Sequence, residues 1–170
     1  MITTVMEKMI DYFKNDVRRI NHALKVLTFA HIISQEELAD EKIHQILCFT
    51  AILHDIGIKE AERKYHSSGA KYQEIEGPHI ARHILTQLDI SQGYIERICF
   101  IIGNHHSYAQ IDGMDFQMLV EADFLVNMYE DSMNQDTIRN IRDTIFKTKS
   151  GKRLLESMYL EEESGLKRHE

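Results

Sequence analysis

The sequence predicts an all-α fold, a single globular bundle of about seven or eight helices. Apolar residues recur with a period near 3.6 along almost the whole chain, and they show none of the alternation of half-buried strands. The 170 residues include one proline and eight glycines, so residues that break helices are scarce. A chain of this length that is 43% hydrophobic and 28% charged can bury a proper core.

The first half of the chain predicts three helices and one long loop. The helices are expected over residues 2–13, 17–33 and 40–55, with Asp16 as the N-cap of the second. Their inward residues include Val5, Met9, Ile20, Leu24, Leu27, Ile46, Leu47 and Leu53. The polar stretch 56–73 contains two glycines and two serines, so we expect a long loop there, with room for a short helical turn, and treat it as a candidate lid.

The second half predicts five more helices. One begins at Pro78, because the N–H that proline lacks is not needed in a first helical turn, and it runs over 78–88. The others are expected over 92–105, 115–130, 137–147 and 151–161. We expect one domain over 1–162, followed by a frayed C-terminal tail over 163–170.

Composition narrows the classes of function. The formal charge of −7 argues against a general nucleic-acid surface, but metal ions could still attract a small phosphorylated substrate. No apolar run approaches the roughly 20 residues of a membrane span, so no membrane partner is expected. Cys48 and Cys99 stand alone in apolar contexts, which predicts buried, reduced thiols and, with no signal peptide in view, a cytoplasmic protein. A homodimer through the terminal helices is left open.

Several ionisable residues fall on apolar faces or at the ends of apolar helices. They are His22, His54, Asp55, His79, His105 and Asp123. Taken singly, each is explained as a hydrogen-bonded core residue, and Asp123 could pair with Arg97. Taken together, they would be satisfied at once by a metal ion, because His and carboxylate ligands suit Zn, Fe, Mn, Ni or Co.

The order His22, His54-Asp55, Asp123 resembles the signature of the HD-domain superfamily of metal-dependent phosphohydrolases. The contexts "LHDIG" and "EADFL" carry the likeness, which covers about residues 17–130. The resemblance implies that these four residues hold one divalent ion, which could be Fe, Mn, Co, Ni, Zn or Mg. In members with two ions, His79 and His105 would serve the second ion and Asp55 would bridge the pair.

A further likeness concerns the segment "NHHSYAQIDG", which is similar to part of the HD-GYP cyclic-di-GMP phosphodiesterases and adds His106 to the expected ligands. The Gly-Tyr-Pro triplet of that subfamily is absent, and "DGMDF" stands in its place, which argues against that activity. The catalytic residues that the resemblance implies are Asp55 and His54. Lys59 is added as a candidate contact to a substrate phosphate.

Three functions remain open at this point. The first is hydrolysis of a nucleotide or another small phosphate ester by a metal-activated water at one or two ions. The second is a diiron oxygenase with the same order of ligands, and the third is a regulatory module that binds metal or ligand without turnover. His83 is four residues after His79, a spacing that can chelate zinc, and its role is left open. His31, His44, His66 and His169 are expected at the surface or in loops.

Overall fold

The protein is all-helical, as predicted. The computed structural model describes residues 1–160, and this part of the chain forms nine α-helices, one short 3₁₀ helix and no strand. The α-helices are α1 (Ile2–Phe13), α2 (Val17–Glu36), α3 (Glu41–Leu53), α4 (Ile58–Tyr65), α5 (Ala70–Thr86), α6 (Gln92–Ile102), α7 (Met114–Glu130), α8 (Gln135–Thr144) and α9 (Lys149–Tyr159), and the 3₁₀ helix η1 spans Tyr108–Gln110. Among them, none is both long and apolar enough to cross a bilayer. The tail predicted over 163–170 lies outside the described residues.

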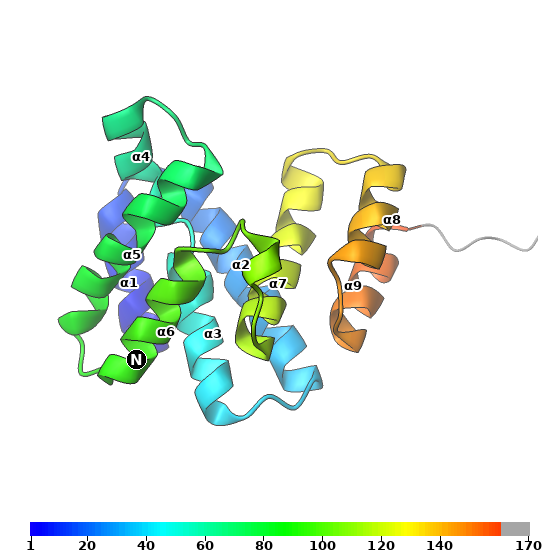
Figure 1. The fold of residues 1–170 in the computed structure, drawn as a ribbon, viewed down its shortest axis with the longest axis horizontal. Helices are drawn as coiled ribbons and strands as arrows, with labels where there is room; N and C mark the ends of the chain where they lie inside the picture. The colour runs from blue at the N-terminus through cyan, green and yellow to red at the C-terminus, as the bar shows by residue number, and fades with distance from the viewer. Residues whose placement is uncertain (161–170) are drawn as a thin grey trace, which may run out of the picture.

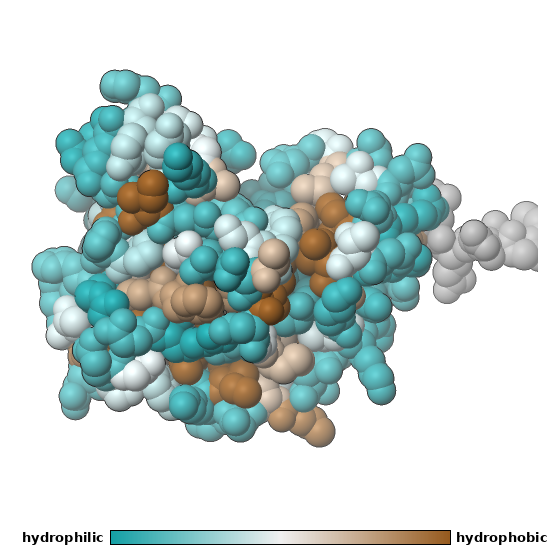
Figure 2. Space-filling model, in the orientation of Figure 1, coloured by the Kyte–Doolittle hydropathy of each residue, from teal (hydrophilic) through white to brown (hydrophobic). Residues whose placement is uncertain are grey.

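Helices α2, α3 and α7 pack against one another at the centre of the bundle (Figure 1). On one side α6 packs on α3 and α5 packs on α6, while α9 covers α7 on the other side. The core is filled by aliphatic and aromatic side chains such as Leu47, Ile52, Ile98, Phe116 and Leu125, all inaccessible or nearly so. The face seen in Figure 2 is mostly hydrophilic, with small separate apolar patches.

The long amphipathic helices agree with their prediction. Helix α1 has the predicted bounds, and Asp16 caps α2 by accepting a hydrogen bond from the Arg19 N–H at 3.3 Å. Asp40 caps α3 in the same way, through the N–H of Ile43 at 2.8 Å. Since α3 ends at Leu53, His54 and Asp55 stand in the turn that follows it rather than in the helix.

The prediction of a long loop over 56–73 is wrong. Residues 58–65 form α4, in which Ala61 is the buried residue, and the next helix begins at Ala70. Polar contacts rather than apolar periodicity hold α4 in place: Lys64 Nζ and Tyr65 Oη reach the carboxylate of Glu76 on α5 at 2.6 and 2.9 Å. Helix α4 is short and mostly polar, so its composition resembles that of a loop, which is why the sequence did not predict it.

Pro78 does not start a helix but lies inside α5. Tertiary packing outweighs the backbone hydrogen bond that proline removes. The turn after Asp55 lies directly against α5, where an added Cβ on Gly57 would come within 2.5 Å of both Gln73 O and Gly77 N. Gly57 and Gly77 therefore allow the two backbones to approach closely beside the candidate site.

Candidate metal centre

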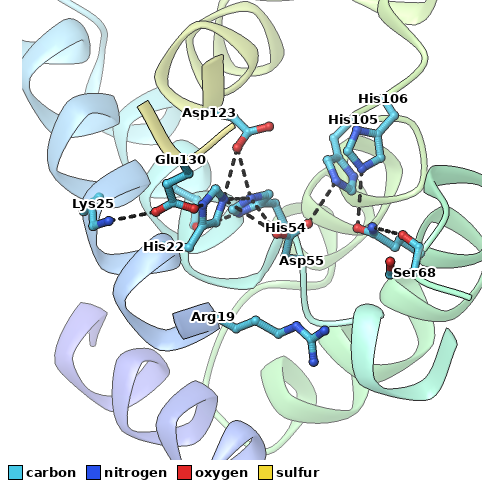
Figure 3. A network of polar contacts seen from close by, with 12 residues as sticks. Arg19, His22, Lys25, His54, Asp55, Ser68, His105, His106, Asp123 and Glu130 are labelled. Carbon is cyan, nitrogen blue, oxygen red and sulfur yellow. Dashed lines mark hydrogen bonds and ion pairs between the residues drawn. The ribbon is translucent and has the colours of Figure 1, made fainter. Parts of the chain in front are cut away.

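Six of the predicted site residues, His106 included, meet where four helices end or cross (Figure 3). His22 comes from the second turn of α2, and His54 and Asp55 follow α3. His105 lies in the turn after α6, and Asp123 comes from the middle of α7. Each turn places a polar residue directly after a buried apolar helix, so the side chains point into the protein while the backbone leaves the core.

A first group of ligand atoms is formed by His22, His54 and Asp123, which lie within 4.8 Å of one another. His22 Nε2 is 3.1 Å from Asp123 Oδ1 and 3.2 Å from His54 Nε2. The distance from His54 Nε2 to Asp123 Oδ1 is 3.6 Å. All three side chains are largely buried, so these polar atoms face one another rather than solvent.

A second group is formed by Asp55, His105 and His106. Asp55 connects the two groups through its two carboxylate oxygens, as Figure 3 shows. Oδ2 lies 3.6 Å from the Nε2 atoms of both His22 and His54, whereas Oδ1 lies 3.5 Å from His105 Nε2. One carboxylate is thus shared between two sets of imidazoles.

The second nitrogen of each buried imidazole is held by an acceptor. Nδ1 of His54 donates to the carbonyl of Ala51 at 2.9 Å, and Nδ1 of His105 donates to that of Ile102 at 2.8 Å. Nδ1 of His22 lies 3.0 Å from the carboxylate of Glu130, whose other oxygen accepts from Lys25 at 2.7 Å. With the protons on Nδ1, the three Nε2 lone pairs point to the centre of the cluster, as in histidines that bind metal.

Charge balance also calls for a cation in this cluster. Burial by itself would raise the pKa values of Asp55 and Asp123, but the neighbouring histidines hold both well below the usual range. Burial opposes a charge on His54, yet these two carboxylates outweigh it and raise the pKa of His54 to about 9. Burial and His105 lower the pKa of His106 to about 4, so His106 is neutral at pH 7, the form that binds metals.

The residues present fit a divalent ion. His105 Nε2 is buried and has no hydrogen-bond partner within residues 1–160, because Asp55 Oδ1, at 3.5 Å, is too distant for a good bond. His22 Nε2 and His54 Nε2 also face each other at 3.2 Å, which two lone pairs tolerate only with a proton or a metal ion between them. The donor set of imidazoles and carboxylates suits Zn, Fe, Mn, Co or Ni.

A cavity of about 510 Å³ opens beside the cluster, a size typical of small-molecule sites. Among its lining residues are five carboxylates (Asp16, Asp55, Asp123, Glu130 and Asp131) and two guanidinium groups (Arg18 and Arg19). Without added cations, this lining would repel a phosphate.

Comparisons with known proteins agree with this arrangement. The sequence profile described as HD domain matches residues 19–147, well over half of the chain. The chain belongs to the HD domain family. The crystal structure of a predicted HD superfamily hydrolase from an uncultured Thermotogales bacterium superposes with a TM-score of 0.67 at 20% sequence identity, over 91% of this chain and 83% of that one. That likeness shows the same fold. No curated protein matches the chain.

Two histidines of α5 lie outside the cluster of this HD domain. His79 is exposed on α5, which is a correction to its expected place beside Asp55. The inward face of α5 carries Gln73, Gly77 and Ala81. His79 follows Gly77 by two residues, so its side chain is rotated by about 200° around the helix axis, away from that face. His83 is exposed as well, with Gln87 as its hydrogen-bond partner.

Lys59 also points away from the HD cluster. Its ammonium donates to the carbonyl of Tyr12 at 2.8 Å and lies 4.9 Å from the centre of the Tyr12 ring. It therefore links α4 to α1 and does not face the cavity. Since 56–73 contains a packed helix, the candidate lid is reduced to the segment between α4 and α5, from which Ser68 lines the cavity.

The sequence pattern missed other residues of the site. Glu130 lies two helical turns after Asp123 on the same face of α7, a spacing that could have indicated a carboxylate partner for His22. Gln73 and Glu74 hold His106 in place. Gln73 Oε1 lies 3.4 Å from the His106 Nε2 atom, and the Glu74 carboxylate accepts a hydrogen bond from the His106 backbone N–H at 3.0 Å. Asp123 does not pair with Arg97, whose guanidinium binds Asp112 and Asp115 instead.

Proposed function

We propose that this HD domain is a metal-dependent phosphohydrolase acting on a small phosphate ester such as a nucleotide, with two divalent ions bridged by Asp55. The observation that carries the proposal is the placement of Asp55, whose Oδ2 faces His22 and His54 while its Oδ1 faces His105. Membership of the HD family supports hydrolase chemistry at this place.

The ligand assignment follows the two groups. His22, His54, Asp123 and Asp55 would hold the first ion, and His105, His106 and Asp55 the second. His79 has no part in this assignment because its side chain is exposed on α5. When bound, divalent ions would lower the pKa of a coordinated water molecule and neutralise charge on the phosphoryl oxygens.

The chain itself contributes orientation and exclusion of water. Glu130 and the carbonyls of Ala51 and Ile102 hold the Nδ1 sides of the three buried imidazoles, so their Nε2 atoms already point to the centre of the cluster. Since the pKa of His54 is raised to about 9, binding of an ion would displace its Nε2 proton. His54 and His105 are 1% and 3% exposed, which keeps solvent from their side of the site. Within residues 1–160, the cavity is thus the open side of the site for solvent and substrate.

Two arginines at the start of α2 are the cationic side chains that line the cavity within residues 1–160. Arg19 already binds Asp16 and Glu62 at 2.7 and 2.6 Å, whereas Arg18 is exposed. We assign Arg18 as the contact to a substrate phosphate in place of Lys59, because a guanidinium binds phosphate oxygens in pairs. Arg18→Ala is expected to raise KM more than it lowers kcat.

The test combines metal analysis with a substrate screen. Protein stripped by a chelator is reloaded with Mn²⁺, Fe²⁺, Co²⁺, Ni²⁺, Zn²⁺ or Mg²⁺ and assayed with p-nitrophenyl phosphate, bis-p-nitrophenyl phosphate and nucleoside mono-, di- and triphosphates. Asp55→Asn should lose both activity and bound metal. Asp112→Asn is the matched control, because Asp112 is exposed and pairs with Arg97 away from the cavity.

Two outcomes would overturn the proposal. Full metal content and activity in Asp55→Asn would contradict the bridging role. Two bound irons with a mixed-valence EPR signal and oxygen consumption, without hydrolysis of any phosphate ester, would favour the diiron oxygenase instead.

A further inference from the structure

A second cluster of metal-ligating side chains lies near the connection between α2 and α3. His31 on α2 and His44 and Cys48 on α3 each offer one ligand atom, and the three atoms lie within 4.8 Å of one another. His44 is ten residues before His54, which places this cluster about 15 Å along α3 from the HD centre. We propose that His31, His44 and Cys48 form a separate site for a zinc-like transition-metal ion that joins α2 to α3.

Ser34 fixes the tautomer that such a site needs. Its hydroxyl donates to the carbonyl of His31 at 2.9 Å, and it lies 2.7 Å from His44 Nδ1. A carbonyl can only accept, so the hydroxyl proton is used there and His44 Nδ1–H must be the donor to Ser34 Oγ. The lone pair of His44 is therefore on Nε2, the atom that faces Cys48. This is the arrangement found in histidines whose outer nitrogen is held by a protein acceptor while the inner one binds metal.

The spacing of the two α3 ligands matches a tetrahedral ion. Zn–S bonds of about 2.3 Å and Zn–N bonds of about 2.0–2.1 Å imply an S···N separation of about 3.6 Å. The distance from Cys48 Sγ to His44 Nε2 is 3.6 Å. Since the two residues are four apart on one helix, no backbone movement is needed to bring them to the same ion.

His31 completes the set from the neighbouring helix. Its ring centre lies 5.1 Å from that of His44, and its side chain is exposed. A tetrahedral N···N separation is about 3.3 Å, so the His31 ligand atom needs to move by at most about 1.5 Å, which is within reach of a side-chain rotation. Solvent on this side leaves the fourth position to a water molecule.

The donor set separates this cluster from the HD centre. One thiolate and two imidazoles select Zn, Co, Ni or Cu over Mg, Mn or Ca, whereas the HD centre combines imidazoles with carboxylates. Binding exchanges the thiol proton for the metal: Cys48 releases H⁺ to solvent as the S–metal bond forms, with no change of oxidation state. Burial, with a smaller effect from Glu41, raises the pKa of Cys48 to about 11, so metal affinity should increase with pH.

Such an ion would stabilise the two helices that supply His22 and His54. Helices α2 and α3 pack against each other, and their connection crosses only a few residues around Asp40. An ion bound only by the folded state adds stability in proportion to the logarithm of its concentration over its dissociation constant. The cluster thus has a structural role, distinct from hydrolysis at Asp55.

The experiment is a Co²⁺ titration of metal-free, reduced protein. Binding is monitored by the near-ultraviolet charge-transfer absorption of a cobalt–thiolate bond. This band reports Cys48 alone, because the residues around Asp55 include no cysteine. We expect the band to saturate at one equivalent per chain, to disappear in Cys48→Ser, to weaken in His44→Ala and His31→Ala, and to be displaced by Zn²⁺.

Matched controls keep the test independent of folding and of the HD centre. Cys99→Ser alters the other buried thiol, and His83→Ala removes an exposed histidine of α5, so both should retain the band. Asp55→Asn should also retain it, even if hydrolysis is lost. A wild-type protein without the band at saturating Co²⁺, or a Cys48→Ser variant that keeps it, would overturn the proposal and leave only a thiol–imidazole hydrogen bond between Cys48 and His44.

Discussion

Replacement of Gly57 by alanine tests the close contact that places the turn of Asp55 against α5. The backbone of Gly57 is in the right-handed helical region, so alanine suits its conformation and the effect is purely steric. The new Cβ would lie 2.5 Å from Gln73 O and from Gly77 N, about 0.9 Å inside ordinary contact. Overpacking of this kind lowers the free energy of unfolding by about 1–3 kcal/mol. In a chain of this length, a loss of about 2 kcal/mol lowers Tm by about 4–8 °C.

The assay is thermal unfolding followed by circular dichroism at 222 nm, with Gly93→Ala as the matched control. Gly93 lies in α6 with nothing within 4 Å of an added Cβ, so the same substitution should stabilise the helix by about 0.5–1 kcal/mol. The two variants thus differ in sign. A Gly57→Ala protein that melts at or above the wild-type temperature would refute the reasoning, because the backbones would then not be in contact.

Three further predictions concern single side chains. Glu130→Gln weakens the hold on His22 and should lower metal affinity by about 10–100-fold with little change in fold, which a competition titration with a chromophoric chelator measures. His79→Ala should leave metal content and activity unchanged, and a loss of either would return His79 to the ligand set. Glu37 accepts hydrogen bonds from Ser150 N and Oγ at the start of α9, which lower its pKa from 4.5. Glu37→Gln should therefore lower Tm at pH 7, and the difference from wild type should shrink as the pH falls below about 4.5, because a carboxyl with a depressed pKa loses its stabilising effect on protonation. A difference that grows on acidification would contradict that role.

Helix prediction succeeded where a helix brings many apolar residues to the core. Helix α1 buries one face through Val5, Met9 and Phe13, whereas α7 is buried on nearly all sides over its first half. Helix α4 has a single buried residue, Ala61, and depends on the contacts of Lys64 and Tyr65 with Glu76 twelve and eleven residues away. No local pattern encodes such contacts. Pro78 was misplaced for a related reason, because packing of α5 on α6 outweighs the local preference of proline.

By itself, the sequence determined that the chain is helical and that ionisable residues follow buried helices at His54-Asp55 and at His105. These are local properties, since they depend on apolar periodicity and on the cost of burying a polar group without a partner. Only the tertiary structure decided which side chains share a centre. It oriented the two oxygens of Asp55 towards different histidines, and it left His79 on the outer face of α5. Such relations depend on helix phase and on contacts between residues far apart in the chain, which a one-dimensional pattern does not contain.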